Sequence, residues 1–198
     1  MSFERGVIVD KYSSYHELAE SEKEGTDYEK IVRALDGALV AVIAPHGGGI
    51  EPKTDLIAQE IAGADFSLYC FRGCKAKGNR GLHITSHNFD EPECVMLVVG
   101  HKWVVAIHGC DEEGEQVFLG GLDKALIVDL AAQLKQVGIS VEAAGHKYRG
   151  TTPSNICNRG KSNAGVQFEL SLKFREGAHV QTFIAAVRSV LCARQNAA

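Results

Sequence analysis

The apolar stretches of this sequence are short, and segments with helical periodicity separate them. The two longest, residues 38–45 and 103–107, have the length of a β-strand. We expect strands at residues 38–44, 65–71, 82–85, 103–107, 116–119, 139–143 and 166–170. Helices are expected from Pro52 to Gly63, at residues 92–99 and 122–137, and in a last helix whose apolar face holds Val180, Phe183, Ile184, Val187, Val190 and Leu191. Strands that alternate with helices predict an α/β fold, a mixed β-sheet with helices on both faces.

Length and hydropathy are typical of one soluble domain. The 198 residues contain no internal repeat and no Pro/Ser-rich linker, so we expect residues 1–198 to form a single domain. No apolar run approaches the roughly 20 residues of a membrane span, and no signal peptide precedes the first polar stretch. We therefore expect a protein that is cytoplasmic as synthesised, has no membrane partner and is a monomer. The six cysteines include no C-x-x-C pair, which favours small buried side chains in a reducing compartment.

The charge of the chain is acidic overall but locally basic. The formal net charge of −4 argues against nucleic acid as a partner, because phosphate binding needs a basic footprint. Residues 72–80 carry four basic side chains and no acid, and residues 144–175 carry six with Glu169 as the single acid. Two basic stretches on an acidic protein indicate a local site for anions.

Two histidines stand where predicted strands end. His46 follows the first apolar run and precedes Gly47-Gly48-Gly49, and His108 follows the run at residues 103–107. Glu51 can return to the same point through the glycines. Two histidines, one glutamate and a fourth position open to water form a catalytic zinc pattern. Hydrogen-bonded structural histidines and an anion-binding glycine turn are the alternative interpretations.

Further polar residues accompany this pattern. His83 and His87 lie near a predicted strand end and are candidates to line the site. Glu169 lies in an otherwise apolar strand, where a carboxylate is costly to bury unless it has a partner or a function. It is a candidate general base, and the residue pattern alone equally allows a place on the solvated face of an edge strand.

Several of these residues lie in motifs that resemble a known family. The segments His46-Gly-Gly-Gly-Ile-Glu51, Asn155-Ile-Cys-Asn158-Arg159-Gly160 and Gly165-Val-Gln-Phe-Glu-Leu-Ser171, with His108 at a strand end, resemble the phage-type poly-γ-glutamate hydrolases. Bacterial relatives of that family are often labelled phage-related replication proteins. The resemblance runs from about Asp27 to the final helix. It implies a zinc-carboxypeptidase-like fold, one bound Zn²⁺ per chain and hydrolysis of γ-glutamyl amide bonds.

The resemblance also implies roles for individual residues. His46, Glu51 and His108 match the zinc ligands, and Glu169 matches the general base of carboxypeptidase-like enzymes. Asn158 and Arg159 resemble the pair with which carboxypeptidases hold a substrate carboxylate, a function that suits a guanidinium fork. Carboxypeptidases proper use H-x-x-E, whereas four residues separate His46 from Glu51 here, a spacing that fits the smaller family.

An anionic polymer would give the basic stretches a function, since poly-γ-glutamate has one free carboxylate per residue. Lys147, Arg149, Lys161 and Arg175 are candidates to hold it, with solvated surface cations as the alternative. A phage-derived enzyme could also be released by cell lysis. Two other functions stay open, a zinc amidohydrolase of small N-acyl amino acids and a nucleic-acid-associated replication factor.

Overall fold

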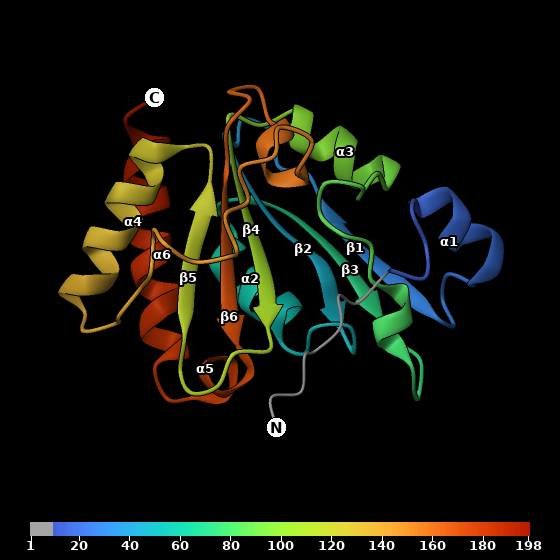
Figure 1. Ribbon diagram of the computed structural model, residues 1–198. Coiled ribbons are helices and arrows are strands. Elements are labelled where there is room, and N and C mark those ends of the chain that lie inside the picture. The colour runs from blue at the N-terminus through green and yellow to red at the C-terminus, as the bar shows by residue number, and fades with distance from the viewer. Residues whose placement is uncertain (1–9) are drawn as a thin grey trace.

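The computed structural model describes residues 10–198, and its centre is a mixed sheet of six strands. The spatial order is β1-β3-β2-β4-β6-β5, with β3, β2, β4 and β6 parallel to one another and the edge strands β1 and β5 antiparallel to their neighbours. In Figure 1 the arrowheads of β2, β4 and β6 point to the same, lower edge of the sheet. The strands are β1 Tyr28–Arg33, β2 Val40–Gly48, β3 Ser67–Gly73, β4 Trp103–Cys110, β5 Val117–Gly121 and β6 Val166–Ser171.

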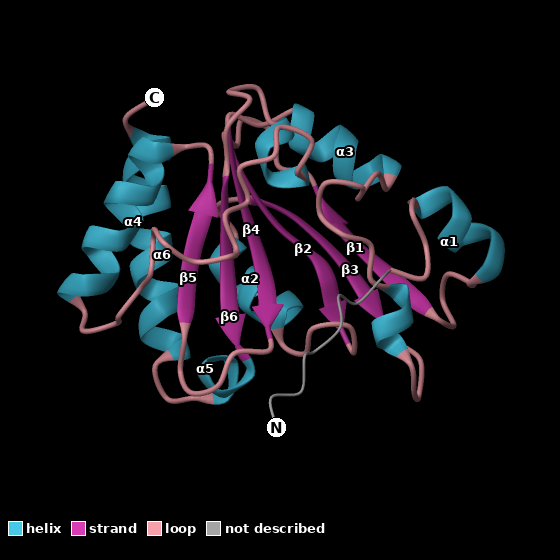
Figure 2. Cartoon of the chain, viewed as in Figure 1, coloured by secondary structure: helices cyan, strands magenta, loops and turns pink. Residues whose placement is uncertain are grey.

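Helices cover both faces of this sheet, as the sequence predicts. Among the described residues, the buried apolar side chains form two clusters, one on each face. Helices α2, α4 and α6 contribute to the first cluster, and α1, α3 and the short helix η2 to the second (Figures 1 and 2). The helices are α1 Tyr15–Ser21, α2 Thr54–Ala62, η1 Asn79–Leu82, α3 Pro92–Val99, α4 Lys124–Gln136, η2 Ile156–Arg159, α5 Leu172–Glu176 and α6 Val180–Asn196.

Local sequence signals account for the main helix boundaries. Asp123 caps α4 by accepting a hydrogen bond of 2.9 Å from the Leu126 amide, and Gly138 follows its last turn with φ +79°. Pro92 occupies the first turn of α3, where its missing N–H costs nothing. No helix among residues 10–198 combines the length and apolarity that a bilayer span requires.

Two of the expected strands are wrong, and some observed elements were not predicted. Residues 82–85 are not a strand, because the Thr85 amide and the Ile84 carbonyl bind the side chains of Asp10 and His46 instead of a neighbouring strand. Residues 139–143 form only an isolated bridge between Glu142 and Phe118. Strand β1 and helix α1 were missed, since the half-exposed, charged sequence of β1 lacks the apolar run that marks the central strands.

The buried carboxylate of Glu22, the residue that ends helix α1, connects this helix to the loop after β3. This carboxylate pairs with Lys75 and accepts hydrogen bonds from Tyr12 at 2.6 Å and from Lys11 at 3.0 Å. Burial alone would raise the pKa of Glu22, but these three donors outweigh it and lower the pKa to about 2 from an ordinary value of 4.5.

Glu22→Gln is expected to lower the free energy of unfolding at neutral pH by about 2 kcal/mol, because the variant loses charge-assisted hydrogen bonds. A lowered native-state pKa stabilises the fold above the unfolded-state pKa, and this stabilisation disappears as the pH falls from 4.5 toward 2. Urea unfolding of wild type and variant at several pH values measures the difference. The exposed Glu113→Gln is the matched control. A gap between wild type and Glu22→Gln that stays constant down to pH 2 would contradict the assignment.

Candidate metal and catalytic site

The strand-end residues singled out from the sequence meet at one edge of the sheet. His46 lies in the last part of β2 and His108 in the last part of β4, and their exposed fractions are 1% and 2%. Strand β6 places Glu169 directly opposite His108 in the parallel register. The register of β2 with β3 shifts between Ala44 and Gly47, where Pro45 cannot donate a ladder hydrogen bond. This irregularity falls at His46.

The glycines after His46 allow Glu51 to return to it. Gly48 has φ +61°, and a Cβ there would lie 2.5 Å from the Gly73 carbonyl oxygen, so the tight approach of the two strands requires glycine. The Glu51 amide then donates to the His46 carbonyl at 2.8 Å. The Glu51 carboxylate is held from the other side by the Gly109 amide, which donates to Oε2 at 2.8 Å.

The side chains of His46, Glu51 and His108 form a compact group of metal-ligand atoms. One ligand atom from each lies within 4.8 Å of the other two. The two Nδ1 atoms are 3.1 Å apart, and Nδ1 of His46 is 3.2 Å from Oε1 of Glu51. Nε2 of His46 faces the Ile84 carbonyl at 2.8 Å, and a carbonyl can only accept. The proton of neutral His46 is therefore on Nε2, which leaves the lone pair of Nδ1 directed into the group.

The two carboxylates of the site have opposite electrostatic environments. Burial would raise the pKa of Glu51, but the adjacent His46 and His108 hold it well below its usual range. Burial, and then the negative charge of Glu51, raise the pKa of Glu169 well above its usual range. One carboxylate thus stays ionised and suits metal binding, while the other is poised to exchange a proton.

His83 adjoins this group without belonging to it. Its ring centroid is 4.0 Å from that of His46, and its Nε2 is 3.8 Å from Oε1 of Glu51. Its Nδ1 lies 2.6 Å from the Asp10 carboxylate. Burial and the neighbouring His46 lower the pKa of His83. The prediction that His83 lines the site is therefore in keeping with its position.

The group opens into a cleft of about 560 Å³ whose rim carries charged side chains. Arg80 pairs with Asp111 at 2.7 Å, and Lys147 pairs with Glu112 at 2.7 Å. Arg80 appeared in the sequence only as part of a basic stretch, because nothing local indicates that the η1 turn reaches the strand ends. The lining residues are His46, Glu51, Arg80, His83, Thr85, Ser86, His108, Gly109, Cys110, Asp111, Glu112, Lys147, Tyr148 and Glu169.

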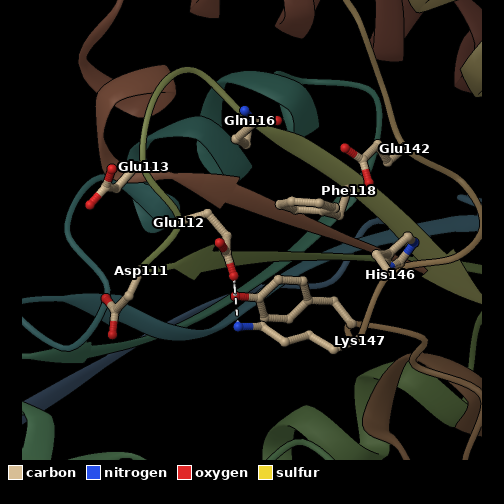
Figure 3. Close-up of a pocket in the computed structure, with 9 residues that line it drawn as sticks. Asp111, Glu112, Glu113, Gln116, Phe118, Glu142, His146 and Lys147 are labelled. Carbon is tan, nitrogen blue, oxygen red and sulfur yellow. Dashed lines mark hydrogen bonds and ion pairs between the residues drawn. The ribbon is translucent and has the colours of Figure 1, made fainter. Parts of the chain in front are cut away.

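A second hollow of about 570 Å³ lies beside the cleft, and Asp111, Glu112, Lys147 and Tyr148 line both. Figure 3 shows Lys147 directed toward Glu112, with Phe118 and His146 beyond them. The Tyr148 hydroxyl also donates to Glu112, at 2.9 Å. These contacts form a wall between the cleft and the hollow.

Six of the predicted substrate-binding residues lie outside the lining of the cleft. The two N–H groups of the Asn158 amide donate to the carbonyls of Gly150 and Thr152, so the predicted grip on a substrate carboxylate is replaced by a structural role. Arg159 donates to the Phe89 carbonyl, and Arg175 is buried with donors on the carbonyls of Leu170 and Pro52. Arg149 lines a separate hollow, and His87 and Lys161 are exposed.

This chain matches a known protein family over most of its length. Residues 12–188 match the model of the family described as poly-gamma-glutamate hydrolase. The UPF0714 protein YndL of Bacillus subtilis (strain 168) is 37% identical over 169 residues, which is 84% of this chain and 66% of YndL. This chain therefore spans just under two thirds of that relative.

Solved structures of two proteins superpose on nearly the whole of this chain. A bacteriophage poly-gamma-glutamate hydrolase superposes with a TM-score of 0.91 at 27% identity, over 96% of this chain and 100% of that one. A zinc-free apo structure of YndL superposes with a TM-score of 0.87 at 32% identity, over 94% of this chain and 99% of that one. A putative carboxypeptidase from Burkholderia mallei, at 14% identity and a TM-score of 0.51, covers 86% of this chain and 60% of that one, and it shares the fold.

Proposed function

This chain belongs to the poly-gamma-glutamate hydrolase family, and we propose that it is a zinc-dependent hydrolase that cleaves γ-glutamyl amide bonds of poly-γ-glutamate. The observation that supports this most strongly is the convergence of three metal-ligand side chains beside a half-buried carboxylate of raised pKa, in an open cleft. Hydrolysis of an amide needs an activated water and a group that moves its proton.

The donor set fits zinc in chemistry and in spacing. Two imidazoles and one carboxylate are the protein ligands of a common catalytic zinc site with one open position. Zinc bonds of about 2.0–2.1 Å in a tetrahedron place ligand atoms about 3.3 Å apart. The separations here are 3.1 Å between the Nδ1 atoms, and 3.2 Å and 3.7 Å from these atoms to the Glu51 oxygens. When bound, zinc would supply the Lewis acidity that activates water and polarises the scissile carbonyl.

The protein's own groups would carry the proton and hold the substrate. Glu169 takes a proton from the attacking water as the new C–O bond forms. It then delivers this proton to the amine nitrogen as the C–N bond breaks. The raised pKa of Glu169 suits this exchange, because a stronger base accepts a proton more readily than an ordinary carboxylate.

The rim of the cleft offers cations for the free carboxylates of the polymer. Arg80 and Lys147 are each paired with an acid, Asp111 and Glu112, from the loop after β4. A substrate carboxylate can take the place of either acid without leaving a cation unpaired. The open cleft and the two separate cations favour a polymer over a small N-acyl amino acid.

The test is amine release by the zinc-loaded protein, with poly-γ-glutamate and with a small N-acyl glutamate as parallel substrates. Turnover of the polymer with little turnover of the small compound supports the proposal. The reverse result would assign the chain to the small-substrate amidohydrolases. Activity on neither, together with DNA binding that weakens steeply with salt, would favour the nucleic-acid alternative.

Lys147→Gln is the companion variant in this assay. Loss of this rim cation is expected to raise KM for the polymer about 5-fold and to leave kcat nearly unchanged. The reason is that the contact with the substrate is equally strong in the ground state and the transition state. Lys135→Gln, on the outer surface of α4, removes the same charge away from the cleft. Equal KM values for the two variants would contradict a substrate role for Lys147.

A further inference from the structure

Behind Glu169 lies a chain of buried amides that the catalytic roles above do not use. Gln167 and Glu169 occupy alternate positions of β6 and so point to the same side of the sheet. Asn155 Nδ2 donates to Gln167 Oε1 at 2.8 Å, and Gln167 Nε2 donates to Glu169 Oε1 at 3.0 Å. The exposed fractions of Gln167 and Asn155 are 5% and 6%. Among residues 10–198, Gln167 is the only side chain that hydrogen-bonds the Glu169 carboxylate.

The direction of this chain is fixed from its far end. The Cys157 amide donates to Asn155 Oδ1 at 3.1 Å, so the NH₂ group of Asn155 must face Gln167. Gln167 then has to present its oxygen to Asn155 and its NH₂ group to Glu169. A reversed Gln167 amide would set its NH₂ group against the NH₂ group of Asn155, two donors facing each other.

The surrounding backbone prevents Gln167 from moving away. Gly150 lies against it so closely that a Cβ there would be 2.6 Å from the side-chain amide carbon of Gln167. Asn158 holds this glycine in place by donating to its carbonyl at 2.7 Å. The loop that brings Lys147 to the cleft therefore also closes over Gln167.

We propose that Gln167, oriented by Asn155, is a positioning residue for Glu169. The NH₂ group of Gln167 donates a hydrogen bond to Oε1 of Glu169. Oε2 is therefore the oxygen that takes the proton from water and returns it to the amine. The inference rests on the proposed hydrolase function for its catalytic consequence, whereas the orientation of the carboxylate is a property of the fold.

Two nearly isosteric variants test whether Gln167 positions the Glu169 carboxylate or only fills space in the core. Gln167→Glu keeps an acceptor for Asn155 but presents an oxygen to Glu169 in place of the NH₂ group. Asn155→Asp keeps an acceptor for the Cys157 amide but loses the donor to Gln167, so the Gln167 amide turns over.

The experiment uses the zinc-loaded full chain and measures zinc content, thermal unfolding, kcat and KM on poly-γ-glutamate. Each variant is expected to lose about 100-fold in kcat, the cost of a misplaced catalytic group, with KM nearly unchanged and zinc retained. The double variant should lose no more than either single one, because the chain acts as a unit. Gln136→Glu, on the exposed end of α4, is the matched control.

Crystal structures of the zinc-loaded wild type and Asn155→Asp provide a readout that needs no substrate. The Gln167–Glu169 hydrogen bond is expected to be absent from the variant, with the Glu169 carboxylate rotated. An unmoved carboxylate, or Gln167→Glu with wild-type kcat, would overturn the inference. A wild type that is inactive on the polymer would instead contradict the proposed function, and the crystal structures would still decide the positioning role.

Discussion

Glu169→Gln is expected to bind zinc as the wild type does and to lose about 10²–10⁴-fold in kcat, the contribution of a general acid–base group. The substitution keeps the shape of the side chain and removes its capacity to take a proton. Its Oε1 can still accept from Gln167 Nε2, so the local hydrogen bond survives. Loss of a half-buried carboxylate near Glu51 also relieves repulsion, since the charge of Glu51 is among the causes of the raised Glu169 pKa. We therefore expect the variant to unfold at the same temperature as the wild type or a higher one.

The measurements are zinc content, thermal unfolding and steady-state amine release on the same preparations. Glu142→Gln, on the exposed rim of the second hollow (Figure 3), makes the same chemical change outside the cleft and is expected to keep full activity. An active Glu169→Gln enzyme would transfer the proton-moving role to another group of the cleft. Loss of zinc from the variant would instead make Glu169 a ligand.

The sequence predicted that His46, Glu51 and His108 lie close together because the signals for this grouping are local. His46 and His108 each follow an apolar run long enough for a buried strand, and parallel strands end at a common edge. Glu51 is close in sequence to His46, and glycines allow the return. The sheet and the site follow from the same short-range pattern, which is why both were predicted together.

The parts that failed depend on contacts between distant segments. The amide of Asn158 is consumed by main-chain carbonyls six and eight residues away in a loop whose path no periodicity reveals. Arg175 looks like a surface cation in sequence, yet Gly109 leaves space for its guanidinium, which the fold buries behind the site. The Ile84 carbonyl that orients His46 carries no side-chain signal at all, because any residue has a carbonyl.

His108→Ala is expected to weaken zinc binding by more than about 100-fold, since even changes of residues behind a ligand cost 10–100-fold. The variant retains Glu51 and His46, too few protein ligands for a site of the catalytic type. Because His108 faces Ser86 and the cleft as well as the core, far-UV circular dichroism must accompany the metal titration. The exposed His179→Ala is the matched control and should bind zinc like the wild type.

His83→Ala distinguishes between His108 and His83 as the third zinc ligand beside His46 and Glu51. Nε2 of His83 is 3.8 Å from Glu51, close enough for a small movement to bring it to the metal. Its Nδ1 is held by the Asp10 carboxylate, and its ring lies against that of His46, with the centroids 4.0 Å apart. We therefore expect His83→Ala to keep about one zinc per chain, as a three-ligand site without His83 requires. If His83→Ala lost zinc while His108→Ala kept it, the ligand set would be His46, Glu51 and His83, and His108 would be a substrate-facing residue.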